Sequence, residues 1–250
     1  TLALDYLSSL DREKPDYHLA PLLRDSLDFL KYMAHPDGSF GGLYGSRNTR
    51  FLYPAGVEEI CNSYSLANDF ISFVRTAHEN NTVVSLSSMD DSNLIPMFNS
   101  FCRAAAHYRP ISRQINKLPF AQAPFQKEFN EAGLIICRTT DSYSIINWRK
   151  GGAYYSSNAG VSGGILAKNK KGEWFSSQIS KNARIINQTE DSFTVETPLA
   201  KQSQVFPNPL HFLILRLLSL SLMKVKFFNG LVKNILVWYL ITRQKRKINI

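Results

Sequence analysis

Four polar or ionisable side chains that could act together on an acidic substrate stand close together in one stretch: Tyr44, Arg47, Asn48 and Tyr53. Arg47 and Asn48 end in planar groups with N–H donors, and such groups can pair with a carboxylate. Tyr44 and Tyr53 could serve as the base and the acid of a proton transfer next to that carboxylate, if a nearby cation lowers the phenol pKa from about 10. These four residues are the predicted catalytic group.

The group belongs to a glycine-rich stretch, residues 35–56, with the sequence HPDGSFGGLYGSRNTRFLYPAG. Glycines permit turns with positive φ, and a long loop of this kind inside a compact domain is usually functional or disordered. Its aromatic side chains can anchor it against helix ends, so we expect an ordered loop with Arg47, Asn48 and Thr49 pointing into a cavity. The alternative is a structural crossover between two helices, in which Arg47 and Asn48 hold carbonyl groups of the loop itself.

The loop lies in a half of the chain that predicts helices. Apolar residues recur at helical spacing in four segments, and a His-Pro stop ends the second of them. The fourth requires Pro96 to lie in its first turn. The predicted helices are residues 2–10, 21–34, 57–79 and 92–108.

After a proline-rich segment with little periodicity, the period of the apolar pattern changes to two. Short runs rich in β-branched and aromatic residues alternate with turn residues, as an antiparallel meander requires. The predicted strands are residues 133–139, 143–148, 153–156, 163–168, 174–178, 183–187 and 192–197. We therefore place a helical domain at residues 1–110, a linker at 111–128, and an antiparallel β domain with a helical insertion, expected to be incomplete, at 129–250.

The formal net charge of +9 is concentrated at one end of the chain. Residues 201–250 hold nine Lys and Arg and no acid, whereas residues 1–200 hold 20 basic and 20 acidic residues. A basic surface spread over the whole protein is absent from this pattern, so we expect no nucleic-acid partner.

The same end carries long apolar runs between residues 207 and 241. The uncharged run at residues 234–242 is nine residues long and the one at 202–215 is 14, both shorter than the roughly 18 to 20 that a membrane span needs. We expect no transmembrane span and predict a pair of amphipathic helices, residues 211–228 and 231–242. Two alternatives are a β-hairpin around the Asn-Gly pair at 229–230 and peripheral membrane contact through residues 207–247.

The cysteines and the start of the chain give expectations about cofactors and cellular location. Cys61, Cys102 and Cys137 are far apart and have no Cys-x-x-Cys or histidine-rich neighbourhood, so neither a zinc site nor a disulfide framework is predicted. We expect no metal and no cofactor. The chain begins at Thr1 without a signal-like stretch, and because it also lacks an initiator Met we expect it to be a fragment. A cytoplasmic location is the expectation, and a periplasmic one if a missing N-terminal segment carries a signal.

Three segments carry a resemblance to a known family: HPDGSFGGLYGSRNTRFLYPAG, SSMDDSNLIPMFNSFCRAAAHY and FNEAGLIICRTTDSYSIINWRKGG. They resemble the heparinase II/III-like and alginate-lyase-like proteins. The resemblance implies an (α/α) toroid followed by a β-sandwich over most of residues 1–200, and β-elimination of uronate-containing glycans. The implied partner is an acidic polysaccharide or oligosaccharide.

The family's β domain usually carries a histidine segment, and residues 129–200 contain no histidine. A non-catalytic carbohydrate-binding or surface-polysaccharide assembly protein is therefore an alternative. The Asp-Gly-Ser-Phe-Gly-Gly sequence also looks like the loops of terpene cyclases and prenyltransferases, which are toroids too. An isoprenoid-binding toroid is the third reading, although no aspartate-rich metal motif accompanies it.

Three further residues are predicted to bind the substrate: His35, Asn93 and Trp148. His35 precedes Pro36 at a helix end, where an imidazolium could instead complement the helix dipole. Asn93 follows an Asp-Asp pair that is predicted to cap the fourth helix. Trp148 could stack on a sugar ring, and core packing is its alternative because it alternates with apolar strand residues.

Overall fold

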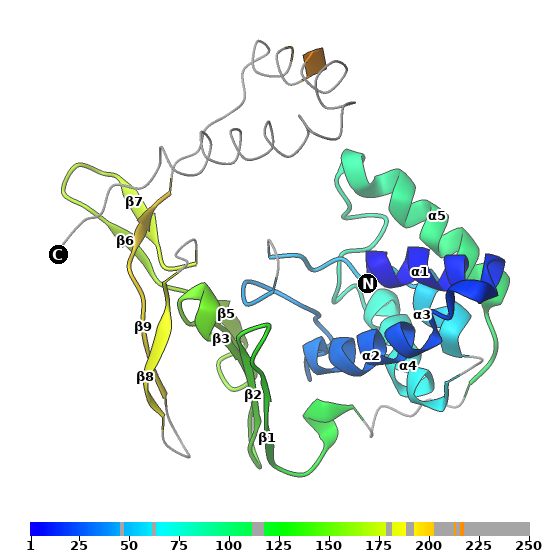
Figure 1. Cartoon of the computed structure of the whole chain (residues 1–250), viewed down its shortest axis with the longest axis horizontal. Coiled ribbons are helices and arrows are strands. Elements are labelled where there is room, and N and C mark those ends of the chain that lie inside the picture. The colour runs from blue at the N-terminus through cyan, green and yellow to red at the C-terminus, as the bar shows by residue number, and fades with distance from the viewer. Residues whose placement is uncertain are drawn as a thin grey trace. The chain divides into compact units, whose positions relative to one another are not determined.

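The computed structural model covers the chain and describes residues 1–45, 48–61, 64–111, 118–178, 182–188, 193–202, 213 and 216–217. Two compact units are present, Thr1–Trp148 with Gly152–Gly163, and Arg149–Gly151 with Gly164–Ile250. Helices come first along the chain and antiparallel strands follow, which confirms the predicted α+β class (Figure 1).

The first unit begins with five α-helices. Two short 3-10 turns accompany them, η1 at Pro15–Tyr17 and η2 at Lys31–Met33. The α-helices are α1 (Leu2–Glu13), α2 (Ala20–Leu30), α3 (Ala55–Cys61), α4 (Ser65–Glu79) and α5 (Asp91–His107).

Two of these helices correct the sequence prediction. The single helix expected at residues 57–79 is broken at Tyr64, whose backbone is extended with φ −134° and ψ 116°. Periodicity does not detect the break because the apolar face continues across it. Pro96 lies inside α5, beyond the first turn in which we expected it. The α5 start is capped as predicted, since the Asp90 side chain accepts from the backbone N–H of Asn93 at 3.2 Å.

Helix α3 packs against α1, α4 and α5 and forms the centre of the helical layer. Close approach to α1 depends on Gly56, because a Cβ there would lie 2.6 Å from the Asp5 backbone nitrogen. Apolar residues of α3 and α4 fill the core. The buried Glu58 carboxylate in this core accepts two hydrogen bonds from the Arg75 guanidinium, at 2.6 and 2.8 Å.

The first unit also contains a five-stranded antiparallel meander in the order β1-β2-β3-β4-β5. Its central register pairs Ile136 with Ile145 and Ile145 with Tyr155, and all three side chains are buried. The strands are β1 (Phe125–Phe129), β2 (Leu134–Arg138), β3 (Tyr143–Asn147), β4 (Ala153–Ser156) and β5 (Val161–Gly163).

This sheet packs directly on the helices of its own unit. The Tyr143 hydroxyl donates to the Tyr32 carbonyl at 2.7 Å, and the Phe129 ring meets the rings of Phe29 and Tyr32 edge-on. The last residues of the expected linker form β1, which the sequence does not predict. The unit thus runs across residues 111–128, and a separate helical domain ending there stays a prediction.

The second unit contains a three-stranded sheet, β10-β7-β6, and a two-stranded one, β8-β9. The expected strand at residues 163–168 is divided between β5 and β6, one in each unit. The expected helix pair at 211–228 and 231–242 lies almost wholly outside the described residues. The strands are β6 (Leu166–Lys168), β7 (Trp174–Ser176), β8 (Arg184–Gln188), β9 (Phe193–Glu196) and β10 (Ala200–Lys201).

Membrane crossing can be judged for the described part of the chain. No helix there is both long and apolar enough to cross a bilayer.

Candidate functional site

The glycine-rich loop joins η2 to α3, and its folding depends on backbone conformations that favour glycine. Gly38 and Gly41 have φ angles of 80° and 68°. A Cβ on Gly41 would lie 2.5 Å from the Thr49 carbonyl oxygen, so the two limbs of the loop touch there. At this point the loop leaves no room for a side chain in place of Gly41.

A chain of hydrogen bonds runs through this loop from the exposed Asp37 to the buried Tyr44. The Ser39 hydroxyl donates to Asp37 at 2.7 Å, which leaves its lone pairs to accept from His35 Nδ1 at 2.7 Å. The other ring nitrogen, Nε2, is then the acceptor for the Tyr44 hydroxyl at 2.8 Å. Because burial keeps His35 uncharged, its one N–H is on Nδ1, and the Tyr44 hydroxyl, which also lies 3.5 Å from the Met33 carbonyl oxygen, donates to Nε2.

The strands of the first sheet hold this pair in place. The Tyr155 ring stacks on His35 with centroids 3.6 Å apart and an interplanar angle of 6°. Asn147 Nδ2 donates to the Tyr44 carbonyl at 2.8 Å. The side chains of His35 and Tyr44 are 1 % and 0 % exposed, so the pair has no direct access to solvent.

Burial keeps these groups uncharged. It lowers the pKa of His35 to about 4, with the nearby Asp37 opposing and Arg50 supporting the shift. It raises the pKa of Tyr44 well above its ordinary value, and it also raises the pKa of Tyr53. The expected lowering of a phenol pKa by a cation is therefore not found at either tyrosine. Their role as acid and base stays a prediction.

The structure brings together two of the predicted site residues, His35 and Tyr44. Tyr53 is also buried, and its backbone N–H donates to Thr1 Oγ1 at 3.1 Å. Asn48 is exposed and has a left-handed φ of 52°, which is uncommon outside glycine. Arg47 lies outside the described residues.

The remaining two predicted residues lie elsewhere. The Asn93 side chain donates to both carboxylate oxygens of Asp90 at 2.9 Å and so completes the cap of α5. Trp148 begins the 3-10 turn η4 (Trp148–Lys150), where it is half-buried and its backbone N–H donates to the Gly133 carbonyl at 2.9 Å. Sequence reasoning missed Arg50, an exposed guanidinium two residues after Asn48, although the Arg-Asn-Thr-Arg spacing could have revealed it.

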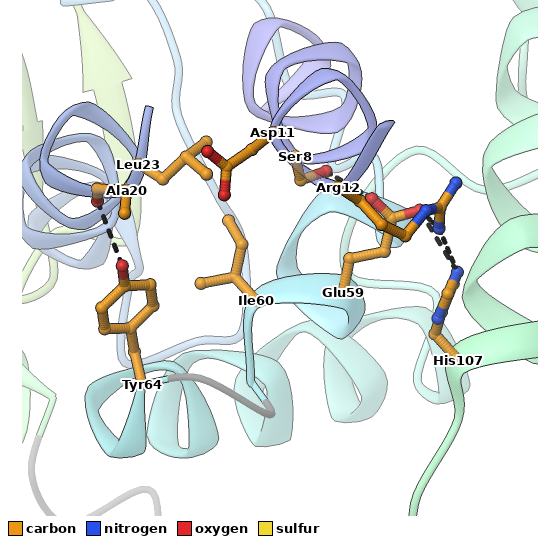
Figure 2. A pocket seen from close by; sticks show the side chains of 9 residues that line it. All are labelled: Ser8, Asp11, Arg12, Ala20, Leu23, Glu59, Ile60, Tyr64 and His107. Atoms are coloured by element: carbon orange, nitrogen blue, oxygen red, sulfur yellow. Dashed lines mark hydrogen bonds and ion pairs between the residues drawn. The ribbon is translucent and has the colours of Figure 1, made fainter. Parts of the chain in front are cut away.

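A cavity of about 410 Å³ lies at the opposite end of the same helices (Figure 2). The last turns of α1, α3 and α5 and the first turn of α2 contribute to it. Figure 2 shows the Asp11 carboxylate facing the apolar side chains of Leu23 and Ile60 across the space. The lining residues are Ser8, Asp11, Arg12, Ala20, Leu23, Glu59, Ile60, Tyr64 and His107.

Glu59 is the centre of a charged cluster beside this cavity. Its carboxylate accepts from the Ser8 hydroxyl at 2.7 Å, from Arg12 at 3.1 Å and from Arg103 at 2.7 Å. Burial alone would raise its pKa, but the bonds from Ser8 and Arg103 outweigh burial and hold the pKa below its usual range. The cluster also includes His107, whose Nε2 lies 2.7 Å from Arg12 Nη1.

The cavity's polar groups are engaged with one another or with backbone. Asp11 accepts from the Leu19 backbone N–H at 3.0 Å, and the Tyr64 hydroxyl donates to the Ala20 carbonyl at 3.3 Å. These contacts join four helices, so we interpret the charged cluster as structural. No local motif predicts it, because its members are spread from residue 8 to residue 107.

Within the described residues, no three side chains of His, Cys, Asp or Glu gather as a metal site would require. No protein-family model, curated protein or solved structure matches the chain. Function therefore rests on the chemistry of the residues themselves.

Proposed function

We propose that this protein processes an acidic polysaccharide in the manner of the heparinase II/III-like lyases, and that its glycine-rich loop contacts a uronate unit of that polymer. The proposal takes the helices as hairpins of an (α/α) toroid and the antiparallel strands as the start of a β-sandwich. Its support is the resemblance of three sequence segments together with the order of helices and strands.

The exposed outer limb of the glycine-rich loop is the part of the molecule to which the proposal assigns binding. The loop is anchored from inside by the buried Tyr44 and His35, whereas Asn48 and Arg50 are exposed on its outer limb. An anchored loop has less backbone freedom to lose when its exposed side chains bind a ligand. We call Asn48, Thr49 and Arg50 the loop rim.

The loop rim suits a carboxylate. A guanidinium can donate two parallel hydrogen bonds to a carboxylate, and an amide can add a third. Pairing neutralises the uronate carboxylate, which is the first requirement for removing the neighbouring C5 proton. Arg47, on the same limb in sequence, would add a second guanidinium. Binding and neutralisation are thus the parts of the elimination that we assign to this loop.

A second candidate, a carbohydrate-binding protein without catalysis, is favoured by the state of Tyr44. Its phenol is fully buried and its pKa is raised, so it is unsuited to act as a base on a bound sugar. The two candidates share the loop rim and differ in their product. Elimination leaves an unsaturated uronate, which absorbs ultraviolet light, and binding alone leaves the polymer unchanged.

The test measures binding of an oligomer of galacturonic acid to the full chain by calorimetry at two salt concentrations. Because charge-assisted hydrogen bonds are lost, Arg50→Ala should weaken binding about tenfold, and Asn48→Ala should weaken it less. Higher salt should shrink the effect of Arg50→Ala, since the contact is solvent-exposed. The matched control is Lys14→Ala, which removes one exposed positive charge at the other end of the helical layer.

Two results would count against the proposal. The first is a wild-type chain that binds the uronate oligomer no better than a neutral galactose oligomer. The second is an Arg50→Ala variant that binds as tightly as the wild type while Lys14→Ala binds less tightly, because general attraction by positive charge would then explain the binding.

A further inference from the structure

The second unit presents an exposed tryptophan beside a lysine on its three-stranded sheet. Trp174 is 49 % exposed, and the Lys168 ammonium lies 5.3 Å from the centroid of its ring. The two residues are cross-strand partners on β7 and β6. Leu166, two residues before Lys168 on the same face, is 57 % exposed. An indole, a lysine and a leucine therefore share one open sheet face.

The two faces of this sheet carry different charged side chains. Lys201 pairs with Phe175 in the register, so it lies on the face opposite Trp174, and it bonds Glu173 there. Glu173 is the one acid in the described residues 164–178. The Trp174 face consequently carries the charge of Lys168 with no acid from these strands beside it.

The turn that joins β6 to β7 carries two more lysines, of which Lys171 lies close enough to Glu173 to help lower the pKa of that carboxyl. Lys170 and Lys171 are exposed in it. The turn is fixed by Asn169, whose Oδ1 accepts from the backbone N–H groups of Lys171 and Glu173, each at 2.9 Å. Gly172 closes it with a φ of 79°. A fixed turn limits the backbone ordering that binding would otherwise require.

We propose that Trp174, Lys168 and the turn lysines Lys170 and Lys171 form a second binding surface for an acidic oligosaccharide, which we call the indole platform. The C–H face of a pyranose would pack on the indole, and a carboxylate of the same or the next sugar would pair with lysine ammonium groups. The inference rests on the proposed function for its ligand class and adds a site in the other unit. Charge complementarity selects an acidic glycan over a neutral one.

The experiment uses the full chain and calorimetry with three probes: a galacturonate oligomer, a galactose oligomer of equal length and a thymidine oligonucleotide. Trp174→Ala should weaken uronate binding about fivefold, because it removes the stacking surface. Lys168→Glu should weaken it at least as much and should lower its salt dependence. Lys168→Glu keeps the indole and changes an exposed side chain, so it remains informative if Trp174→Ala misfolds. The matched control is Tyr17→Ala, an aromatic 63 % exposed in the first unit, which should bind as the wild type does.

The outcomes separate this inference from the proposed function. If Arg50→Ala weakens uronate binding and neither platform variant does, the indole platform is overturned and the loop rim stands. If both platform variants weaken binding and Arg50→Ala does not, the platform stands and the loop rim fails. Tighter binding of the oligonucleotide than of the uronate, lost in Trp174→Ala, would overturn the inference in favour of single-stranded nucleic acid. Dimerisation of the wild type that Trp174→Ala abolishes would overturn it in favour of a second copy of the chain.

Discussion

The two ends of the helical layer differ in the charge of their buried polar groups. At the loop end, His35 and Tyr44 are buried and uncharged, and they are joined to each other by a hydrogen bond. At the cavity end, Glu59 is buried and charged, and two guanidinium groups surround it. The same helices reach both ends, since α2 starts at the cavity and leads into the loop, and α3 starts after the loop and reaches the cavity.

The difference shows how each end limits the cost of removing polar groups from water. A buried imidazole avoids a desolvated charge by giving up its proton, which is why the His35 pKa falls. A buried carboxylate keeps its charge only where donors and counter-charges replace water, as Ser8 and Arg103 do for Glu59. At the loop end the exposed groups are those of the loop rim, where the proposed function places binding, whereas the charged contacts at the cavity end join α1, α3 and α5.

The largest effect should come from breaking the cavity end with Glu59→Gln. This change keeps the shape of the side chain and leaves Arg103 with Asp5 as its remaining acidic partner, at 3.3 Å. Breaking a buried ion pair from one side costs about 3 kcal/mol, so the free energy of unfolding at pH 7 should fall by that amount. Denaturant unfolding followed by circular dichroism measures it.

The matched control for this change is Glu13→Gln, because Glu13 is exposed and lies 3.8 Å from Arg12. Its effect should stay within a few tenths of a kcal/mol, as for exposed pairs. If Glu59→Gln and Glu13→Gln unfold at the same denaturant concentration, the cavity-end cluster does not stabilise the fold.

The loop end should differ in its response to acid. The pKa of His35 is lowered from 6.5 to about 4, so between these values the unfolded chain binds a proton that the folded chain does not. Stability from this group is complete above pH 6.5 and is lost as pH falls toward 4, by about 2 kcal/mol at pH 5. The stability that Glu59 contributes is lost in a lower pH range. Its pKa is lowered from 4.5, so this contribution to the free energy of unfolding is lost only below pH 4.5.

Unfolding at pH 8 and pH 5 tests this difference. His35→Gln should remove most of the loss between the two values, and His78, whose pKa burial also lowers, should contribute to the rest. His18→Asn is the control, because His18 is exposed and its left-handed φ of 50° suits asparagine. A His35→Gln variant that loses as much stability at pH 5 as the wild type would show that His35 is not the group that titrates.

Local pattern predicts most strands and helices of this fold but not their breaks. The short aromatic run after the Gly151-Gly152 turn predicts residues 153–156 as a strand, and β4 has those bounds, with Ala153 and Tyr155 buried and Tyr154 exposed. The break at Tyr64 escapes the same reasoning, because an apolar stripe continues through it. Strand β1 escapes because its three middle residues are exposed and its sheet partners come later in the chain.

The site shows a similar division. Glycine and aromatic content predicts a loop anchored by its aromatic side chains, and Tyr44 is buried in the structure. Whether Tyr44 points inward or outward depends on Asn147 and Tyr155, which are more than 100 residues away and leave no local signal. The Glu59 cluster is likewise assembled from three helices, so spacing along the chain does not reveal it.

The smallest effect should come from Tyr44→Phe at the loop end. Removing the hydroxyl leaves His35 Nε2 without its donor at 2.8 Å, and an unsatisfied buried acceptor costs about 1 kcal/mol or slightly more. The ring stays, so packing is kept, and uronate binding at the loop rim should not change. Tyr6→Phe is the control because that tyrosine is 57 % exposed, and the unfolding free energy of this variant should equal that of the wild type.

A Tyr44→Phe variant with unchanged stability that no longer forms the unsaturated uronate product would contradict this expectation. It would mean that Tyr44 reaches the substrate and takes part in proton transfer. The loop end would then be the catalytic end. Tyr44, which is buried in the present structure, would have to become exposed when a substrate binds.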